Sequence, residues 1–375
     1  MSRIVGSATI GISNLVAEKR RAGEDVISFS VGEPDFTTPE HVRAAAKAAI
    51  DAGHTRYTPG PGIPELRQAV AATHQRDNGI PCEASHVLVT PTKHAVLMSI
   101  LAVAEAGDEV LLPDPGWVSY EPVVQWAGAR PVAVPLEGEF RMTPDAVAER
   151  LTSKTRAIVL NSPSNPTGGV NSAADVRGIV ELAEDHDLWI VSDEIYQKLI
   201  YEGQHVSPAS LAFDRTITID GLSKSFAMTG WRIGWAVAPP PAFAQLNKLQ
   251  SHSVTHCTSF AQYGAVAALT GPQDFPAMMR QEFLERREAM VAGLRRLPGV
   301  TCPMPQGAFY AFPRFDPALW GDDEALCMRL IDEALVAGTP GSAFGAAGKG
   351  HLRFSYATGL ERIRAGLERI AAVTP

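Results

Sequence analysis

The chain has 375 residues, of which 45% are hydrophobic, and a formal net charge of −8. This is enough apolar material for a large core in two or three domains. The acidic balance, without a run of five like charges, argues against nucleic-acid and membrane-surface partners and favours a small-molecule ligand.

Two further features concern location and cysteine chemistry. No apolar run reaches the length of a membrane-spanning helix, and the N-terminal stretch is charged and amphipathic, so we expect a cytoplasmic protein. The four cysteines lie far apart without a CxxC pair, which indicates neither a zinc site nor a disulfide framework.

Between about residues 85 and 240, short apolar runs alternate with segments of helical period. This pattern is typical of an α/β domain with a largely parallel sheet. The predicted strands are "HVLVT" (86–90), "EVLLP" (109–113), "RAIVL" (156–160), "LWIVS" (188–192), "TITID" (216–220) and "GWAVA" (234–238).

Helix starts can be predicted between these strands. Thr92 is expected to cap the helix after the first strand, Thr143 the one that begins at Pro144, and Ser172 the one after the third strand. After about residue 275 a long polar helix opens a smaller α+β part. We expect a large domain of residues 35–270 and a small domain of residues 1–34 and 271–375.

Polar residues follow four of the strands, at the sheet edge where open α/β sheets bind ligands. These residues are Thr92 and Lys93, Asn165, Asp193 and Tyr196, and Lys224 and Arg232. A helix start beside a lysine can hold an anion, and a rigid Pro/Gly turn can present an amide. Taken singly, each residue could instead be a cap, a structural turn or a solvated charge.

Taken together, these residues match the needs of one cofactor. Pyridoxal phosphate has a dianionic phosphate, a pyridine nitrogen that a carboxylate keeps protonated, a phenolic oxygen, and an aldehyde that condenses with a lysine. The sequence therefore predicts pyridoxal 5'-phosphate as the cofactor.

Longer motifs carry a resemblance that runs through nearly the whole chain. They are "FSVGEPDFTTPEHV", "YTPGPGIPELRQAVA", "AGDEVLLPDPGWVSYEP", "NSPSNPTGG", "VSDEIYQKLIYEG", "SKSFAMTGWRIGW", "GAFYAF", "PGSAFG" and "HLRFSYAT". With these motifs the chain resembles the class I aminotransferases of the fold-type I pyridoxal-phosphate family, in the branch of bacterial and archaeal aspartate aminotransferases. The resemblance implies a mostly parallel seven-stranded sheet flanked by helices, plus a smaller α+β domain.

The resemblance also implies catalytic roles. Lys224 would be the Schiff-base lysine and would move the proton between substrate and cofactor carbons. Asp193 would keep the pyridine nitrogen protonated. Tyr196 and Asn165 would hold the ring oxygen.

Phosphate contacts are implied for Arg232, Ser223 and the helix start at Thr92 to His94. Two positions depart from the family pattern. "PTK" (91–93) replaces a glycine-containing loop, and Gly221 replaces a common serine, so phosphate affinity would depend more on Arg232.

The remaining implied contacts concern the ring, the substrate and a second subunit. Trp117 would stack on the cofactor ring, Arg353 would bind the substrate's α-carboxylate, and the Gly32 backbone would pass close to that carboxylate. Tyr57 would reach the phosphate in the neighbouring subunit, so a homodimer with shared sites is implied.

The leading hypothesis is an aminotransferase that exchanges amino groups between an L-amino acid and a 2-oxo acid by a ping-pong mechanism. Lys93 stands where close relatives bind the distal carboxylate of acidic substrates, which favours aspartate or glutamate over aromatic or small neutral amino acids. A pyridoxal-phosphate lyase of the C–S β-lyase type is the alternative. A transcription regulator with an aminotransferase-like domain is disfavoured, since it would need a preceding DNA-binding segment and the chain is acidic.

Overall fold

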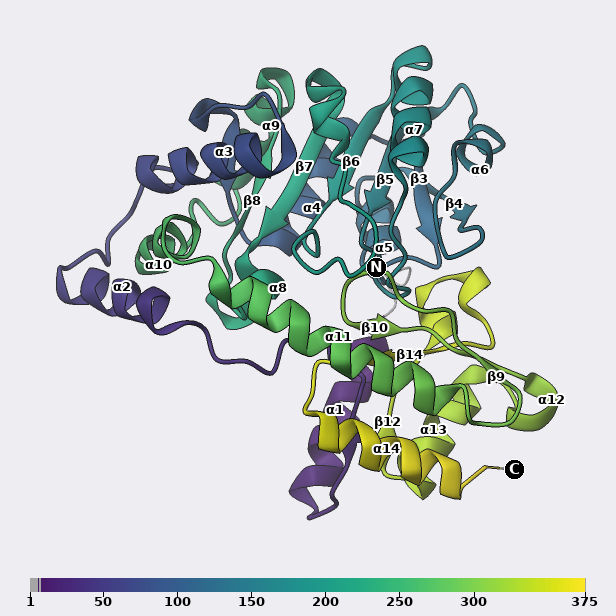
Figure 1. Ribbon diagram of the computed structural model, residues 1–375. Coiled ribbons are helices and arrows are strands. Elements are labelled where there is room, and N and C mark those ends of the chain that lie inside the picture. The colour runs from purple at the N-terminus through teal and green to yellow at the C-terminus, as the bar shows by residue number, and fades with distance from the viewer. Residues whose placement is uncertain (1–5, 7, 375) are drawn as a thin grey trace.

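The computed structural model describes residue 6 and residues 8–374. Its largest feature is a seven-stranded sheet with strand order β2-β8-β7-β6-β5-β3-β4 (Figure 1). Neighbouring strands pair in parallel except for β8, which is antiparallel to β7 and β2. The predicted α/β class is confirmed. In sheet order the strands are β2 (Val87–Val89), β8 (Gly234–Val237), β7 (Thr216–Gly221), β6 (Trp189–Asp193), β5 (Thr155–Asn161), β3 (Glu109–Asp114) and β4 (Arg130–Pro135).

The six strands predicted from the sequence are all present, and the seventh, β4, was missed. It reads "RPVAVP" and forms an edge of the sheet. Proline has no amide hydrogen and is tolerated at sheet edges, which explains why this segment does not look like a central strand.

Helices cover both faces of the sheet, and the alternation of strand side chains decides which helix each residue meets. Val110 and Leu112 of β3 pack in one apolar cluster with α4 (Thr92–Val103), α5 (Tyr120–Trp126) and α9 (Pro240–Ser251). Leu111, between them, packs in another cluster with α6 (Pro144–Ala148) and α7 (Ala173–Asp185). A third cluster joins the β2–β8 end to α2 (Glu40–Asp51), α3 (Pro64–Asn78) and α10 (Ser259–Thr270).

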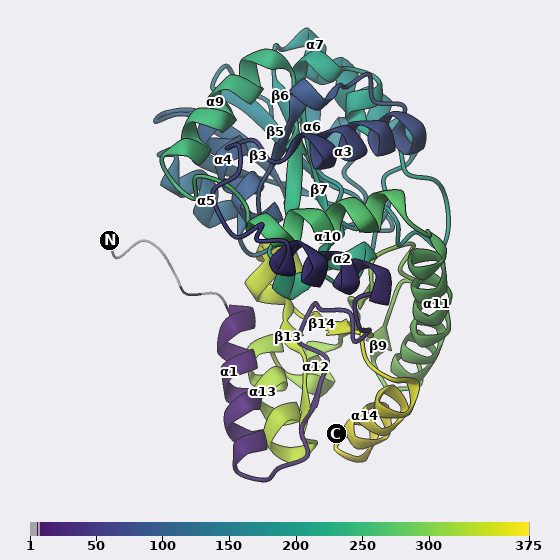
Figure 2. The same cartoon turned by 90° about the vertical axis from the view of Figure 1, so that its left-hand side faces the viewer.

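The second part of the molecule combines both ends of the chain, as the purple and yellow segments of Figure 2 show. The helix α11 (Asp274–Leu294) leads into it from the large sheet (Figure 1). Near the N-terminus, β1 (Ile27–Ser28) pairs in parallel with β12 (Val336–Ala337). Ile27 and Phe29 share one apolar cluster with residues of α11 and α14. Residues 1–5, 7 and 375 of the predicted small domain lie outside the described residues.

The other elements of this part are short strands and helices. They are α1 (Ala8–Arg21), β9 (Val300–Thr301), β10 (Tyr310–Ala311), β11 (Arg314–Phe315), α12 (Pro317–Trp320), α13 (Asp323–Glu333), β13 (Thr339–Pro340), β14 (Leu352–Ser355) and α14 (Leu360–Ala372). β10, β14 and β13 form a three-stranded antiparallel sheet in that order.

Two of the three predicted helix caps are confirmed. Thr143 Oγ1 accepts the Ala146 N–H at 3.3 Å at the start of α6, and Ser172 Oγ accepts the Asp175 N–H at 3.1 Å at the start of α7. The prediction for Thr92 is wrong, because Pro91 occupies the N-cap of α4 and Thr92 is the first helical residue. Within the described part of the chain, no helix is long and apolar enough to cross a membrane.

Candidate active site

A cavity of about 320 Å³ lies beyond the carboxyl ends of β5, β6 and β7, beside the second part of the molecule. The turn α8 (Leu222–Ser225) marks this junction in Figure 1. The cavity brings together residues from both parts of the chain. Of the site residues named from the sequence, those that line it are Gly32, Thr92, Lys93, Trp117, Asn165, Asp193, Tyr196, Ser223, Lys224, Arg232 and Arg353.

Lys224 lies in α8, directly after β7. Its Nζ donates a hydrogen bond to the Gly32 carbonyl oxygen at 2.5 Å and lies 5.9 Å from the centre of the Tyr196 ring. Burial lowers the pKa of Lys224 to about 8, although the nearby Glu33 acts in the opposite direction. A larger fraction of this amine is therefore neutral near pH 7 than for an ordinary lysine, and a neutral amine can act as a nucleophile.

Asp193 ends β6 at the floor of the cavity. Tyr120 Oη donates to its Oδ2 at 2.8 Å, and the Ile195 N–H donates to its Oδ1 at 3.4 Å. Burial raises the pKa of Asp193 to about 6, while the hydrogen bond from Tyr120 opposes the rise. The bond therefore favours the carboxylate at a site that otherwise disfavours charge.

Tyr120 was missed by the sequence analysis. It follows Trp117 in "PGWVSY" and begins α5, and the two rings meet edge to face with centroids 5.2 Å apart. The signal that could have identified it is its place three residues after the predicted ring-stacking tryptophan.

Tyr310 was missed as well. Its Oη and that of Tyr196 are 2.8 Å apart, and burial raises the pKa of both phenols. A Cβ atom on Gly32 would overlap the Tyr310 hydroxyl group. Glycine at position 32 therefore allows the backbone that accepts the Lys224 bond to pass beside this phenol.

Arg353 projects from β14 and is only 3% exposed. Its Nη1 donates to Asn165 Oδ1 at 2.9 Å and its Nη2 to the Ser30 carbonyl oxygen at 2.5 Å. The guanidinium lies 4.7 Å from the Tyr310 ring centre, and its Nε has no partner among the described residues. Asn165 is itself fixed by the bond from its N–H to Asn161 Oδ1 at 2.8 Å. A guanidinium that is oriented in this way can bind a carboxylate through two nitrogen atoms.

The other end of the cavity is suited to an anion. It holds the N-terminus of α4, where Thr92 Oγ1 is buried and, among residues 6 and 8–374, has no hydrogen-bond partner. Arg232 adopts a left-handed backbone conformation with φ of 56° and donates from Nη1 to the Thr229 carbonyl oxygen at 2.8 Å. An unpaired hydroxyl, a helix N-terminus and a guanidinium together fit a phosphate dianion.

Lys93 also points into the cavity. Its Nζ lies 4.9 Å from the centre of the Trp117 ring, and burial, with the charge of Arg232, lowers the pKa of this lysine. His94, the third residue of the predicted helix start, bonds to Ser253 Oγ at 2.9 Å and does not line the cavity.

Tyr57 lies outside the cavity. It is 88% exposed, and its ring packs edge-on against His256 with centroids 5.4 Å apart. Ile10 of α1 and Val31, which the sequence analysis did not name, form an apolar side of the cavity and are 57% and 42% exposed.

Comparisons with known proteins agree with this geometry. A family model described as "Aminotransferase class I and II" matches residues 24–370. An aspartate aminotransferase from Geobacillus stearothermophilus is 42% identical over 99% of this chain and 96% of its own length. The structure of an aspartate aminotransferase from Thermus thermophilus with maleate superposes with a TM-score of 0.96 at 40% identity, covering 99% of this chain and 98% of that one. An aromatic aminotransferase from Pyrococcus horikoshii superposes at 0.90 with 41% identity, over 96% of this chain and 98% of that one.

Proposed function

The chain belongs to the class I and II aminotransferase family, which uses pyridoxal 5'-phosphate, and from this premise we propose that it transfers amino groups between aspartate or glutamate and a 2-oxo acid. The observation that carries the proposal is the arrangement around Lys224. Its enclosed amine shares one cavity with the oriented guanidinium of Arg353 and the hydrogen-bonded carboxylate of Asp193.

The residues present fit the cofactor. The α4 N-terminus with Thr92, Ser223 and Arg232 would hold the phosphate. Asp193 would hold the ring nitrogen, Tyr196 and Asn165 the ring oxygen, and Trp117 would cover the ring. When bound, the cofactor supplies an aldehyde for the amino group and a ring that accepts the electron pair freed at the substrate's α-carbon.

The protein residues divide the remaining work. Arg353 binds the α-carboxylate and thereby orients the substrate, and the neutral form of Lys224 acts as nucleophile. Lys224 Nζ, set free when the substrate's amino group takes its place, would then take the proton from the α-carbon, which its depressed pKa permits near neutral pH. Asp193 holds its negative charge at the floor of the cavity with the help of Tyr120.

Support for an acidic substrate comes from Lys93. This ammonium lies in the cavity over Trp117, and no carboxylate pairs with it among the described residues, so a second substrate carboxylate could bind there. A specific observation favours a second candidate, since Ile10 and Val31 offer an apolar side that suits aromatic or neutral side chains. The relatives include both aspartate/prephenate and aromatic-amino-acid aminotransferases.

We also propose a homodimer in which Tyr57 reaches the partner's cofactor phosphate. The support is the exposure of the Tyr57 ring, which packs against His256. Val254, two residues before His256, is also exposed. The proposed division into residues 35–270 and residues 1–34 with 271–375 is supported by the pairing of β1 with β12. A subunit-mixing experiment would test the dimer, because a Tyr57 variant should impair the site of its partner chain.

The experiment that tests the function is a half-reaction on purified holoenzyme. Aspartate, glutamate, alanine and phenylalanine are added singly, and the absorbance of the bound cofactor is followed. An aminotransferase converts the cofactor stoichiometrically to its amine form, and aspartate or glutamate should react with the highest kcat/KM. Turnover that releases ammonia without this conversion would indicate a lyase, and faster reaction with phenylalanine would favour the aromatic candidate.

A further inference from the structure

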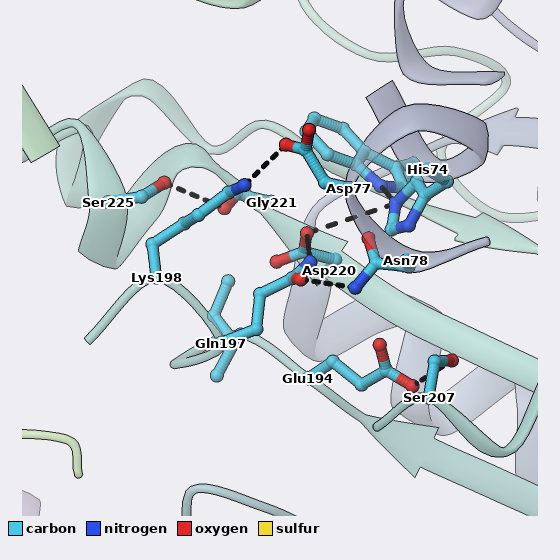
Figure 3. Close-up of polar contacts among 12 residues, drawn as sticks. His74, Asp77, Asn78, Glu194, Gln197, Lys198, Ser207, Asp220, Gly221 and Ser225 are labelled. Atoms are coloured by element: carbon cyan, nitrogen blue, oxygen red, sulfur yellow. Dashed lines mark hydrogen bonds and ion pairs between the residues drawn. The ribbon is translucent and has the colours of Figure 1, made fainter. Parts of the chain in front are cut away.

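A largely buried polar cluster, drawn in Figure 3, plays no part in the chemistry described above. Its central residue is Asp220, which precedes Gly221 at the end of β7 and stands four residues before Lys224. Its second member, Gln197, directly follows Tyr196. The cluster therefore touches the two chain segments that present the predicted nucleophile and the predicted phenol.

Hydrogen bonds connect this cluster in a chain. Gln197 Nε2 donates to Asp220 Oδ2 at 2.6 Å, and Asn78 Nδ2 donates to Gln197 Oε1 at 2.6 Å (Figure 3). The chain runs from the end of α3 through the turn after β6 to the end of β7. It fixes the direction of the Gln197 amide, whose N–H group faces Asp220 and whose oxygen faces Asn78.

His74 lies beside Asp220 without forming an ion pair with it. Its Nε2 is 3.8 Å from Asp220 Oδ2, but the same nitrogen accepts the Trp235 indole N–H at 2.8 Å. It therefore carries a lone pair and no proton. Burial lowers the pKa of His74 to about 4, so the ring is neutral near pH 7. The carboxylate of Asp220 depends on uncharged donors.

The surrounding charges do not neutralise Asp220 either. Burial raises its pKa to about 7, although hydrogen bonds from the Gly221 N–H and Gln197 lower it, and Glu194 raises it further. Lys198 lowers it but is bound to Asp77, which also binds Arg76.

The carboxylate of Glu194, which raises the pKa of Asp220, is already paired. Glu194 bonds to His205 Nε2 at 2.8 Å and accepts the Ser192 and Ser207 hydroxyl groups. Among residues 6 and 8–374, Asp220 therefore has no cationic partner of its own, and its raised pKa places its change of charge near neutral pH.

We propose that Asp220 is a positioning residue which, as a carboxylate, holds the Tyr196 turn in register with the Lys224 turn through Gln197. The proposal rests on the function proposed above. An anionic oxygen makes the bond to the Gln197 N–H charge-assisted, and protonation weakens that bond because the acceptor loses its charge. The register should then loosen as the pH falls through the range in which Asp220 takes up a proton.

The test uses holoenzyme with wild-type chain, Asp220→Asn and Gln197→Leu. The kcat/KM of the amino acid half-reaction and the absorbance of the bound cofactor are followed from about pH 5.5 to pH 8.5. The ratio of wild-type to Asp220→Asn kcat/KM should be near one at the acid end and reach about threefold or more at the alkaline end. The kcat/KM of Gln197→Leu should likewise fall below that of the wild type only toward alkaline pH.

Thermal unfolding of the apo-protein provides a second measurement. If Asp220 had a purely structural role, its substitution would change melting temperature and activity in the same direction. The pKa of Asp220 lies above its ordinary value in the folded chain, so its ionisation opposes folding. The stability that this group contributes is present at low pH and is lost as the pH rises through about 7. Asp220→Asn escapes this loss, so its melting temperature should rise relative to wild type with pH while its activity falls relative to wild type.

Asp175→Asn is the matched control. Asp175 is also buried, accepts the Ser172 N–H at 2.8 Å and binds Arg141 at 2.6 Å, but it lies at the start of α7 outside the cavity. This variant should lower the melting temperature and leave the shape of the pH profile unchanged.

Two results would overturn the inference alone. One is an active wild type for which the ratio of its kcat/KM to that of Asp220→Asn does not change with pH. The other is a Gln197→Leu variant whose kcat/KM depends on pH as in the wild type. A wild-type holoenzyme that does not convert its cofactor would overturn the proposed function, and the inference with it.

Discussion

The hydrogen bond from Tyr120 to Asp193 leads to a quantitative prediction for Tyr120→Phe. The bond joins a buried phenol to a buried carboxylate over 2.8 Å. A hydrogen bond to a charged group contributes about 1.5–3 kcal/mol, which corresponds to about one to two pKa units. Its loss should raise the pKa of Asp193 from about 6 to roughly 7.5.

The consequence is a pH-dependent loss of cofactor affinity, because the predicted contact to the ring nitrogen needs the carboxylate. At pH 7 the ionised fraction of Asp193 should fall from about nine tenths to about one quarter, which weakens binding about fourfold. At pH 6 the loss should reach about fifteenfold, and at pH 8.5 it should nearly vanish.

Stability should respond in the opposite pH range. The folded-state pKa of Asp193 lies above its ordinary value, so ionisation of this group opposes folding, and its stabilising contribution is lost as the pH rises through about 6. Without the Tyr120 donor the ionised Asp193 destabilises the folded protein further. The melting temperature of apo Tyr120→Phe should therefore be lower than that of the wild type at pH 8.5 and close to it at pH 5.

The assay is equilibrium titration of apo-protein with pyridoxal 5'-phosphate between about pH 6 and pH 8.5. Tyr201→Phe serves as the matched control, since this partly buried phenol bonds to the Ala308 carbonyl oxygen outside the cavity. An affinity loss in Tyr120→Phe that is equal at all pH values would refute the reasoning, because it would show that Tyr120 acts through packing rather than through the charge of Asp193.

Four other substitutions test the remaining assignments. Lys224→Ala should abolish turnover while the protein still binds the cofactor, and near-normal transamination would remove Lys224 from its role. Arg353→Lys should lower kcat/KM for all amino acids alike, because lysine lacks the planar fork and the α-carboxylate is common to them; a loss confined to one substrate would show that Arg353 reads a side chain. Lys93→Ala should lower kcat/KM for aspartate about tenfold and spare alanine and phenylalanine, whereas equal losses would assign Lys93 to the cofactor. Tyr57→Phe should weaken cofactor binding in the partner chain, and a fully active wild-type monomer in solution would exclude the shared site.

The features that depend on short segments of the chain were predicted well from the sequence. Asp193 ends a buried strand, and Asn165 and Lys224 follow two others. Parallel strands bring their carboxyl ends to one edge of the sheet, so these residues lie close together. Local caps such as Ser172 were predicted for the same reason, since the bond closes within three residues.

Contacts between distant segments could not be predicted from residue patterns alone. Tyr120 meets Asp193 across 73 positions of the chain, and Tyr310 meets Tyr196 across 114. Tyr310 looks like an ordinary core residue in its own segment, and Tyr120 is marked only by its place three residues after Trp117. The prediction of Thr92 as a cap failed because Pro91 can occupy the N-cap itself, which leaves the Thr92 hydroxyl group free to face the cavity.

The apolar side of the cavity has a consequence for how the substrate range of such an enzyme can change. Ile10 lies on α1 and Val31 on the segment after β1, and both residues are exposed to solvent. Substitutions at exposed positions usually change stability by less than about 0.5 kcal/mol, unlike changes in a packed core. Mutations can therefore change the apolar side of the cavity with little change in the free energy of unfolding. The buried Arg353 and Asp193 meanwhile stay fixed by their hydrogen bonds. New side-chain preferences can be acquired here in single steps, each of which leaves a folded protein on which further selection can act.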